Sequence, residues 1–278
     1  MKDIQSSPDN RNIYIDKVGI KKLKLPITVR DRHRMAQRTV ADVNFYVDLP
    51  HHFKGTHMSR FVELLNDHRE SFDIERIDEI LVKARQKLKA LKAHIELTFP
   101  YFVEKKAPVS GLPGLIDYEC MISAASNGNR KTDTILTIKV PITTLCPCSK
   151  EISRYGAHNQ RSIVTLSVRV NKFIWLEEII RIIEETASCE IYSLLKREDE
   201  KHITEKAYEN PAFVEDVVRA ITEKISQDDR IDWFTVESEN YESIHNHNAY
   251  AFIERNLRAE RKESSASSEE SSQEITAA

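Results

Sequence analysis

The feature that most constrains the fold is a succession of predicted elements that occurs twice along the chain. In the first half, a half-buried strand is indicated by apolar residues that alternate with polar ones, namely Val43, Phe45, Val47 and Leu49. Two amphipathic helices follow, the first capped by Ser59 and the second running from Ile77 to Leu91. Further strands are predicted at residues 95–99 and 132–145.

The second half of the chain repeats this order. Its predicted strands lie at residues 164–170, 233–237 and 249–253. A long helix with one apolar stripe runs from Leu176 to Leu194. Another helix begins at Asn210 and Pro211, a cap followed by a first-turn proline, and its inward face is predicted to carry Val214, Val217, Val218, Ile221 and Ile225. The halves have no visible sequence similarity, so only the architecture is repeated. This succession favours an α+β fold, in which helices cover antiparallel sheet, over alternating βα units.

The two ends of the chain differ in composition from the part between them. The segment 259–278 is rich in Ser and Glu and lacks aromatic residues, which predicts a disordered tail. The first dozen residues are polar, are expected to be similarly loose, and lack the apolar centre of a signal peptide. No apolar run approaches the roughly 18 residues that cross a bilayer. We therefore expect a cytoplasmic protein without a membrane partner.

The charge balance constrains the partners. The chain of 278 residues has 41 basic and 44 acidic side chains and a formal net charge of −3, so nothing in this balance indicates nucleic acid. A small anionic substrate needs only a local cluster of cations and stays possible. A hydrophobic content of 40% is enough for one large domain or two small ones.

Two of the four cysteines are close together, in the stretch TTLCPCSKEISRYGAHNQRS. Four cysteines are too few and too scattered for a disulfide framework, and Cys146 and Cys148 flank a proline just past a predicted strand. The nearby cations Lys150 and Arg154 would favour a thiolate, which is the form that binds metal or attacks carbon. Metal binding or catalysis is the leading interpretation, and two small buried apolar side chains are the alternative.

Further metal-binding or acid–base residue types occur in two segments downstream. His158 follows Gly156, which allows a turn that aims the imidazole back at the cysteines. Catalytic zinc sites use three protein ligands and an open position, and a third ligand is available in the acidic stretch REDEKH, at residues 197–202. The alternative for this stretch is a solvated helix end.

The other segment is SENYESIHNHNAY, which contains Glu242, His245 and His247. In a strand, two histidines that are two residues apart share a face, and imidazole transfers protons near neutral pH. A polar loop with two solvated histidines is the alternative. With the cysteine pair, these segments favour a metal-assisted hydrolytic site in the second half of the chain.

Four long motifs resemble one known family, the prokaryotic type IB GTP cyclohydrolases. These motifs are DIQSSPDNRNIYIDKVGIK, TTLCPCSKEISRYGAHNQRS, REDEKHITEKAYENPAFVEDVVR and SENYESIHNHNAYA. The resemblance extends from Asp3 to about Arg258. It implies hydrolysis of GTP to 7,8-dihydroneopterin triphosphate and formate, for folate or other pterin-derived pathways.

The resemblance also implies a tunnelling fold, with two tandem modules of antiparallel sheet that each carry two helices. The expected segments are an N-terminal segment at 1–20, a first module at 21–145, a second module at 146–258 with most site residues, and the tail at 259–278. The family forms a homotetramer with active sites between subunits, so the same assembly is expected for this chain.

The resemblance assigns a divalent metal, Zn²⁺ or Mn²⁺, to Cys146, His158 and Glu200. It makes Cys146 a catalytic residue as well as a ligand, and it leaves Cys148 as an alternative ligand or proton-transfer partner. The implied chemistry is metal-assisted attack of water on C8 of the guanine ring.

The remaining roles concern substrate and protons. Glu215, which helical periodicity alone gives no reason to select, is assigned to the guanine edge, where a carboxylate accepts bonds from N1 and the 2-amino group. Proton transfer to the ring nitrogens is assigned to His245 or His247, with Glu242 orienting one of them. Candidates for binding the triphosphate are Lys150, Arg154, Arg161 and Lys201.

Three other functions stay open at this point. The chain could be a binding or scaffold protein that has lost catalysis, a structural zinc protein, or an enzyme that acts on a different pterin or purine. The complete set of expected ligands and histidines argues against the scaffold, because a degenerate member of the family would have lost some of them.

Overall fold

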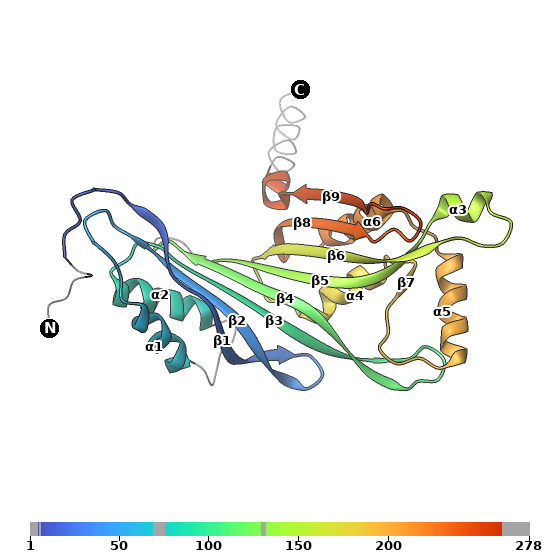
Figure 1. Cartoon of the computed structure of the whole chain (residues 1–278), viewed down its shortest axis with the longest axis horizontal. Helices are drawn as coiled ribbons and strands as arrows, with labels where there is room; N and C mark the ends of the chain where they lie inside the picture. The colour runs from blue at the N-terminus through green and yellow to red at the C-terminus, as the bar shows by residue number, and fades with distance from the viewer. Residues whose placement is uncertain (1–4, 6, 69–75, 129–131, 263–278) are drawn as a thin grey trace, which may run out of the picture. The chain divides into compact units, whose positions relative to one another are not determined.

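The computed structural model describes residue 5 and residues 7–68, 76–128 and 132–262. The strands are β1 (Ile15–Asp31), β2 (Met35–Leu49), β3 (Ala93–Lys106), β4 (Pro113–Ser126), β5 (Asp133–Leu145), β6 (Asn159–Val170), β7 (Cys189–Glu190), β8 (Ile231–Asn240) and β9 (Ala249–Arg255) (Figure 1). The helices are α1 (Met58–His68), α2 (Ile77–Leu88), α3 (Pro147–Ile152), α4 (Leu176–Glu184), α5 (Arg197–Glu209) and α6 (Val214–Ser226). The strands are hydrogen-bonded in the order β1-β2-β3-β4-β5-β6-β8-β9, with β7 paired to β5.

The chain divides into two compact units. The first comprises residues 1–102 and 117–137, and the second comprises residues 103–116 and 138–278. Strands β3, β4 and β5 therefore contribute residues to both units. The first unit also contains β1, β2, α1 and α2, and all other helices and strands belong to the second unit. The module boundary expected between residues 145 and 146 follows the last residue of β5.

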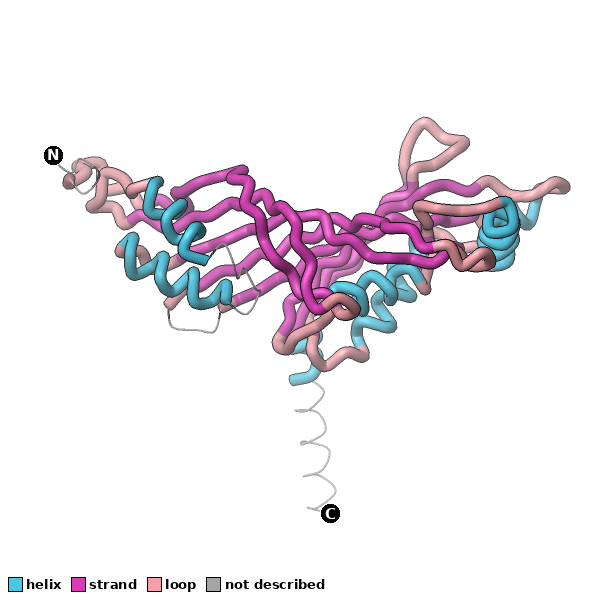
Figure 2. Tube along the Cα trace, turned by 90° about the horizontal axis from the view of Figure 1, so that it is seen from below, coloured by secondary structure: helices cyan, strands magenta, loops and turns pink. Residues whose placement is uncertain are grey.

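The core of the first unit lies between its strands and its two helices. Strand β2 pairs antiparallel with β1 and β3, and its alternating pattern buries Val43, Phe45 and Val47. The ring of Phe45 meets that of Phe61 in α1 edge-on, with 5.3 Å between the ring centres. Helix α2 ends at Leu88 because Lys89 adopts a left-handed backbone conformation and its N–H bonds back to the last turn. Figure 2 shows α1 and α2 side by side on one face of these strands.

The core of the second unit is built in the same way. Strand β8 pairs antiparallel with β6 and β9, and helix α6 packs against β8 and β9 and contacts α4. Buried residues at helical spacing form the inner face of α6, namely Val214, Val217, Val218, Ile221 and Ile225. The same residues were expected on this face from the sequence, so the apolar stripe of this helix is confirmed.

Five of the six predicted strands lie within observed strands, and the sixth, 132–145, begins one residue before β5; β1, β4 and the short β7 were missed. Strand β1 has irregular register against β2 between Ile15 and Val18 and between Ile20 and Leu23, so its apolar residues do not alternate strictly. Strand β4 does alternate, but several of its buried positions carry small or polar side chains, such as Ala124 and Ser126. A pattern search based on strongly apolar residues therefore misses both.

The predicted helix from Leu176 to Leu194 is wrong beyond its first half. Helix α4 ends at Glu184, and the chain then forms β7, in which Cys189 is buried and pairs with Thr143. The apolar residues after 184 fall at helical spacing although the backbone is not helical. Tertiary pairing with β5 has overridden the local pattern here.

Several predicted helix ends are also wrong. Ser59 lies inside α1, which begins at Met58, and Leu91 is exposed beyond the end of α2. The acidic stretch 197–202 lies at the start of α5, where acidic side chains interact favourably with the helix dipole; Glu198 and Glu200 are exposed, as a solvated helix end predicts, whereas Asp199 is buried. Asn210 is the C-terminal cap of α5, and α6 begins later, at Val214.

The chain ends also differ from the expectation. The described part of the first dozen residues is not loose: the N–H groups of Lys54 and Gly55 donate to the backbone oxygens of Ser7 and Gln5, both at 3.1 Å. Residues 257–262 are helical, and the rest of the predicted tail, 263–278, lies outside the described residues. Within the part of the chain that the structure describes, no helix is both long and apolar enough to span a membrane.

Candidate functional site

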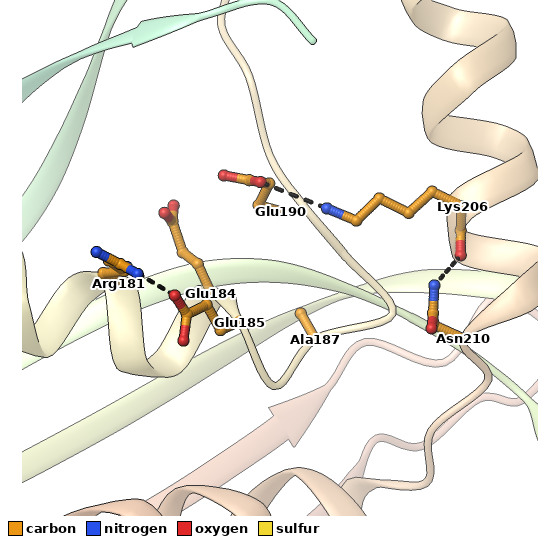
Figure 3. Close-up of a pocket in the computed structure, with 7 residues that line it drawn as sticks. All are labelled: Arg181, Glu184, Glu185, Ala187, Glu190, Lys206 and Asn210. Carbon is orange, nitrogen blue, oxygen red and sulfur yellow. Dashed lines mark hydrogen bonds and ion pairs between the residues drawn. The ribbon is translucent and has the colours of Figure 1, made fainter.

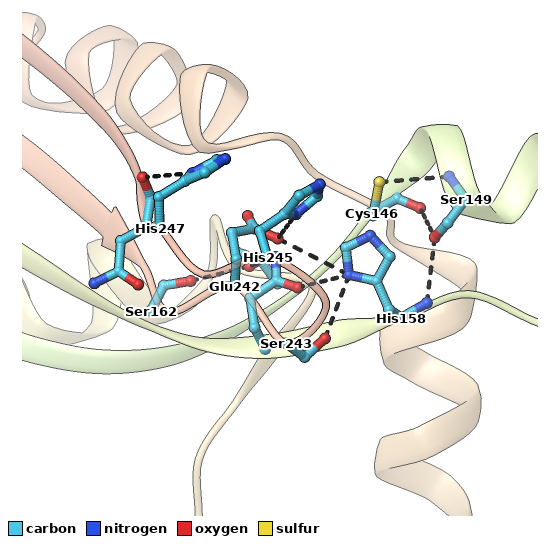
Figure 4. A network of polar contacts seen from close by, with 11 residues as sticks. Cys146, Ser149, His158, Ser162, Glu242, Ser243, His245 and His247 are labelled. Carbon is cyan, nitrogen blue, oxygen red and sulfur yellow. Dashed lines mark hydrogen bonds and ion pairs between the residues drawn. The ribbon is translucent and has the colours of Figure 1, made fainter.

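The Cys-Pro-Cys segment forms the turn between β5 and α3. Cys146 is the N-terminal cap of α3, and its sulfur accepts a hydrogen bond from the N–H of Ser149 at 3.4 Å. The N–H of Cys146 donates to the backbone oxygen of His158 at 3.1 Å. The hydroxyl of Ser149 donates to the Cys146 oxygen and accepts from the His158 N–H, both at 3.2 Å. These bonds bring Cys146 and His158 together, as Figure 4 shows.

The imidazole of His158 lies within a set of polar side chains. Its Nδ1 is 3.1 Å from Oε1 of Gln160, 3.5 Å from the hydroxyl of Ser243 and 4.0 Å from Oε2 of Glu242. The side chains of His158 and Glu242 are only 15% and 11% exposed. The ring is therefore held by neighbours on one edge, at Nδ1.

The loop between β8 and β9 carries the other two histidines. Nδ1 of His245 lies 3.8 Å from the same Glu242 oxygen, and the rings of His245 and His247 are stacked with 5.1 Å between their centres. Both histidines are exposed, and they lie in a loop, not in the strand that would place them on one face. Stacking nevertheless keeps the two rings together (Figure 4). Glu242 thus faces both His158 and His245.

Cys148 and Glu215 lie on the helices that flank this network. Cys148 is exposed within α3. Glu215 is exposed in the first turn of α6. The N–H of Ala212, just before α6, donates to the backbone oxygen of Leu145, the residue before Cys146, at 3.1 Å. The start of α6 is therefore tied to the cysteine turn.

Glu200 and Lys201 lie outside the network that joins Cys146 to His158. Both are exposed on α5, and Nζ of Lys201 is 3.8 Å from Glu205 in the next turn. Among the described residues of this single chain, no three His, Cys, Asp or Glu side chains are arranged to hold a metal ion. The structure brings together two of the three expected ligands.

The chemistry of these two donors fits a divalent metal. A thiol and an imidazole are ligands for Zn²⁺, and the neighbours of His158 lie at Nδ1, which leaves Nε2 for coordination. The first turn of α5 presents the carboxylate of Glu200 to solvent, without a hydrogen bond or ion pair to the described residues. This carboxylate is available as a further ligand.

Two of the cations expected at the triphosphate have aromatic partners within the chain. Nζ of Lys150 lies 4.6 Å from the centre of the Tyr208 ring and donates to the backbone oxygen of the same residue at 2.6 Å. The guanidinium of Arg154 lies 5.3 Å from the centre of the Tyr155 ring. The backbone oxygen of Arg161 accepts a bond from the N–H of Tyr241.

The sequence analysis missed the polar residues that support the network. Gln160 and Ser162 are buried on one face of β6, and Thr144 is buried in β5. A signal for them exists in the sequence, because polar residues occupy positions 160 and 162 of a strand whose later positions on the same face are apolar. Buried polar groups of this kind need partners, and a functional site supplies them.

A separate pocket of the second unit, about 380 Å³ in volume, is lined by Arg181, Glu184, Glu185, Ala187, Glu190, Lys206 and Asn210 (Figure 3). Its charges are largely balanced within the pocket wall. Arg181 lies 2.6 Å from Glu185, and Lys206 lies 3.5 Å from Glu190. Nothing in this lining brings together the residue types of the cysteine and histidine network.

The chain matches a family of known proteins over most of its length. The model of the family described as type I GTP cyclohydrolase folE2 matches residues 1–251. The GTP cyclohydrolase FolE2 of Geotalea uraniireducens is 57% identical over 258 residues, which cover 93% of this chain and 94% of that protein. The FolE2 protein of Syntrophus aciditrophicus is 56% identical over 255 residues, which cover 92% of this chain and 100% of that protein.

Solved structures of urate oxidases share the fold. A highly active mutant of the Bacillus sp. TB-90 enzyme has a TM-score of 0.53 at 10% identity and covers 88% of this chain and 99% of its own. The enzyme from Bacillus subtilis 168 has a TM-score of 0.50 at 7% identity and covers 86% of this chain and 98% of its own. At such identities the likeness concerns the fold alone, and it confirms the predicted α+β tunnelling fold.

Proposed function

The chain belongs to the family of type I GTP cyclohydrolases described as folE2, and we propose that it hydrolyses GTP to 7,8-dihydroneopterin triphosphate and formate in the cytoplasm. This is the first step of folate and pterin synthesis. The observation that carries the proposal is the convergence of Cys146, His158, Glu242 and His245, from three separate segments, in one polar network of a chain that matches the family nearly end to end.

In this proposal Cys146, His158 and Glu200 hold one divalent ion, Zn²⁺ or Mn²⁺. When bound there, such an ion would supply Lewis-acid activation of water for attack on C8 of guanine. The protein's contribution is to orient the donors. The hydroxyl of Ser149 links the backbones of Cys146 and His158 through two hydrogen bonds, and the Ser149 N–H donates to the Cys146 sulfur. Cys148, exposed one residue beyond Pro147, is the alternative thiol ligand or proton-transfer group.

Proton transfer to the ring nitrogens falls to His245 and His247. Their stacked rings are exposed in one loop, where substrate can reach them, and imidazole is suited to transfer near neutral pH. Oε2 of Glu242 lies 3.8 Å from Nδ1 of His245, close enough for the carboxylate to orient that ring.

Glu215 and Lys201 are the proposed contacts to the substrate. A carboxylate at the start of α6 accepts two parallel N–H bonds, from N1 and the 2-amino group of guanine. The bond between Ala212 and Leu145 holds this helix start beside the cysteine turn, in agreement with a base that reaches both. Lys201 is exposed on α5 and supplies a cation for the triphosphate.

The proposal includes a homotetramer with active sites between subunits. Strands β1 and β9 are the edges of the sheet, and an uncovered edge is a ready surface for pairing with another chain. On β9 the large side chains of Tyr250 and Phe252 are 58% and 49% exposed, which agrees with an edge that is covered by a second copy.

The test is incubation of the full chain, loaded with Mn²⁺ or Zn²⁺, with GTP. Formate release and the fluorescence of the oxidised pterin are measured together. We expect both products from the wild type and neither from Cys146→Ala, with the thermal unfolding of the variant little changed. Absence of product with either metal contradicts the proposal, and unfolding of Cys146→Ala would instead indicate a structural metal site.

Cys189→Ala is the matched control. Its thiol is also a free cysteine of the second unit, but it is 1% exposed and burial raises its pKa, so it does not present a thiolate to solvent. This variant is expected to keep the activity of the wild type.

A further inference from the structure

We infer that Gln160 is the positioning residue of His158, which fixes the imidazole with its proton on Nδ1 and leaves Nε2 free to coordinate the metal. This inference deepens the proposed function and rests on it. It assigns a role to Gln160, whose side chain lies on the buried face of β6.

The orientation of the Gln160 amide determines the tautomer of His158. Nε2 of Gln160 donates to the hydroxyl of Thr144 at 2.9 Å, so Oε1 is the atom that faces Nδ1 of His158, at 3.1 Å. A carbonyl oxygen can only accept, which requires that Nδ1 carry the proton. The lone pair of the neutral ring is then on Nε2.

The amide is itself held by buried hydroxyls. Oγ1 of Thr144 and Oγ of Ser162 are 2.9 Å apart, and both residues are 0% exposed. Gln160 is 7% exposed. Thr144 accepts from Gln160, and either hydroxyl can donate in the contact between Thr144 and Ser162. A reversed amide would require Thr144 to donate to Gln160 and Nδ1 of His158 to accept from it, so the roles along the chain from Thr144 to His158 are coupled.

The other neighbours of Nδ1 are less suited to this role. Oε2 of Glu242 is 4.0 Å away, beyond hydrogen-bonding distance, and it is closer to His245. The hydroxyl of Ser243 is at 3.5 Å and belongs to the exposed loop that carries the histidines. Gln160 is the neighbour that is both within hydrogen-bonding distance and fixed in the core of the sheet.

The expected effect concerns metal affinity. A ligating histidine with a fixed second nitrogen does not have to change tautomer or rotate on binding, and loss of such a partner costs about 10- to 100-fold in affinity. Gln160 does not touch substrate in this account, so its loss acts through His158.

The experiment measures the dissociation constants of Mn²⁺ and Zn²⁺ by competition with a chromogenic chelator, on metal-stripped full chain without GTP. Gln160→Leu, which removes the acceptor, should weaken binding about 10- to 100-fold. Gln160→Glu keeps an oxygen acceptor and should remain close to the wild type. Thr144→Val removes the group that orients the amide and should weaken binding less than Gln160→Leu, and it tests the same claim if Gln160→Leu fails to fold.

Two further variants make the result specific. Ser238→Ala removes another buried hydroxyl of this sheet, one that has no hydrogen-bond partner among the described residues, and should leave the affinity unchanged. His158→Ala tests the metal site itself. If His158→Ala loses the metal and folded Gln160→Leu does not, the role of Gln160 is overturned. If His158→Ala binds metal like the wild type, the proposed metal site fails first. An equal loss in Ser238→Ala would overturn the specific role of Gln160.

Discussion

Nζ of Lys150 in α3 donates to the backbone oxygen of Tyr208 in α5 at 2.6 Å and lies 4.6 Å from the centre of the Tyr208 ring. The two helices carry different parts of the expected site, the second cysteine on α3 and Glu200 on α5. The ammonium group therefore serves as a tie within the chain, although the sequence suggested that it binds the triphosphate.

Lys150→Met should lower stability with little change in the KM for GTP. The substitution removes a charged hydrogen bond and a cation–π contact at a partly exposed site, which together are worth about 1 kcal/mol. Denaturant unfolding gives the stability, and initial rates give the KM. Lys201→Met is the reciprocal control and should raise the KM without a loss of stability, because the Lys201 ammonium has, among the described residues, only a 3.8 Å contact with Glu205. A raised KM in Lys150→Met at unchanged stability would return Lys150 to the triphosphate.

The fold could be predicted where side-chain burial alternates regularly. Strand β2 and helix α6 show this, because each buries a uniform apolar face. Strand β1 could not be found in the same way, because irregular register disturbs its alternation. The chain after Glu184 was predicted as helix because its apolar spacing fits a helix, whereas pairing of Cys189 with Thr143 decides the structure. Long-range pairing of this kind leaves no local pattern.

The candidate site was predictable to a similar degree. Residue types and the family resemblance indicated Cys146 and His158, and the structure brings them together through Ser149. The supporting residue Gln160 could not be assigned, because its role depends on a contact with Thr144 on the neighbouring strand. Sequence motifs indicate which atoms can react, and strand pairing determines what holds them.

Asp199→Asn should destabilise the protein by loosening the start of α5. Asp199 is 0% exposed; its Oδ1 accepts from the N–H groups of Val109 and Ser110, and its Oδ2 accepts from the Ser110 hydroxyl and the Lys196 N–H, at 2.7–2.9 Å. An amide nitrogen in place of Oδ2 cannot accept from Lys196. We expect a lower Tm at pH 7. Asp216 is an exposed helix cap that accepts a single backbone bond, from the N–H of Phe213, so Asp216→Asn should have a smaller effect.

The pH dependence of this variant follows from the carboxylate of Asp199. Burial opposes its ionisation, but the hydrogen bonds from Ser110, Lys196 and Val109 outweigh it and hold the pKa of Asp199 well below its usual range. A lowered pKa in the folded state stabilises the fold above the unfolded pKa of about 3.9, and this stability is lost as the pH falls toward the folded pKa. The difference in Tm between wild type and Asp199→Asn should therefore shrink in acid. A constant difference would contradict this account.

Lys105→Met should be among the most destabilising single changes in the second unit. Nζ of Lys105 lies 2.8 Å from Glu184 and 2.7 Å from Glu190, and the side chains of Lys105 and Glu184 are each 11% exposed. The substitution leaves two poorly solvated carboxylates without the Lys105 ammonium, which should lower the free energy of unfolding by about 3 kcal/mol. Lys24→Met, which breaks an exposed pair with Asp42, should cost no more than about 1 kcal/mol. Equal losses of stability in the two variants would show that Lys105 is no more important to stability than an exposed ion pair.

The stability difference caused by Lys105→Met should depend on pH. Burial raises the pKa of Glu190, but the bond and charge of Lys105 outweigh it, so the pKa of Glu190 lies below its ordinary value. Its stabilising contribution is complete above the unfolded pKa of about 4.3 and is lost as the pH falls through the folded pKa. The difference between wild type and variant should be largest near neutral pH and decline below about pH 4. Urea unfolding at several pH values measures it.

Removal of the metal should abolish activity, and Mn²⁺ should restore it at least as well as Zn²⁺. The reason is the proposed ligand Glu200, because a carboxylate is a harder donor than a thiolate and increases tolerance for Mn²⁺. Glu200→Cys should therefore shift the preference toward Zn²⁺, whereas Glu198→Cys, at an exposed position of the same turn, should leave it unchanged. Formate release after chelation and back-titration with each metal gives the ratio. Recovery with neither metal would exclude a catalytic ion, and an equal shift in both variants would remove Glu200 from its ligands.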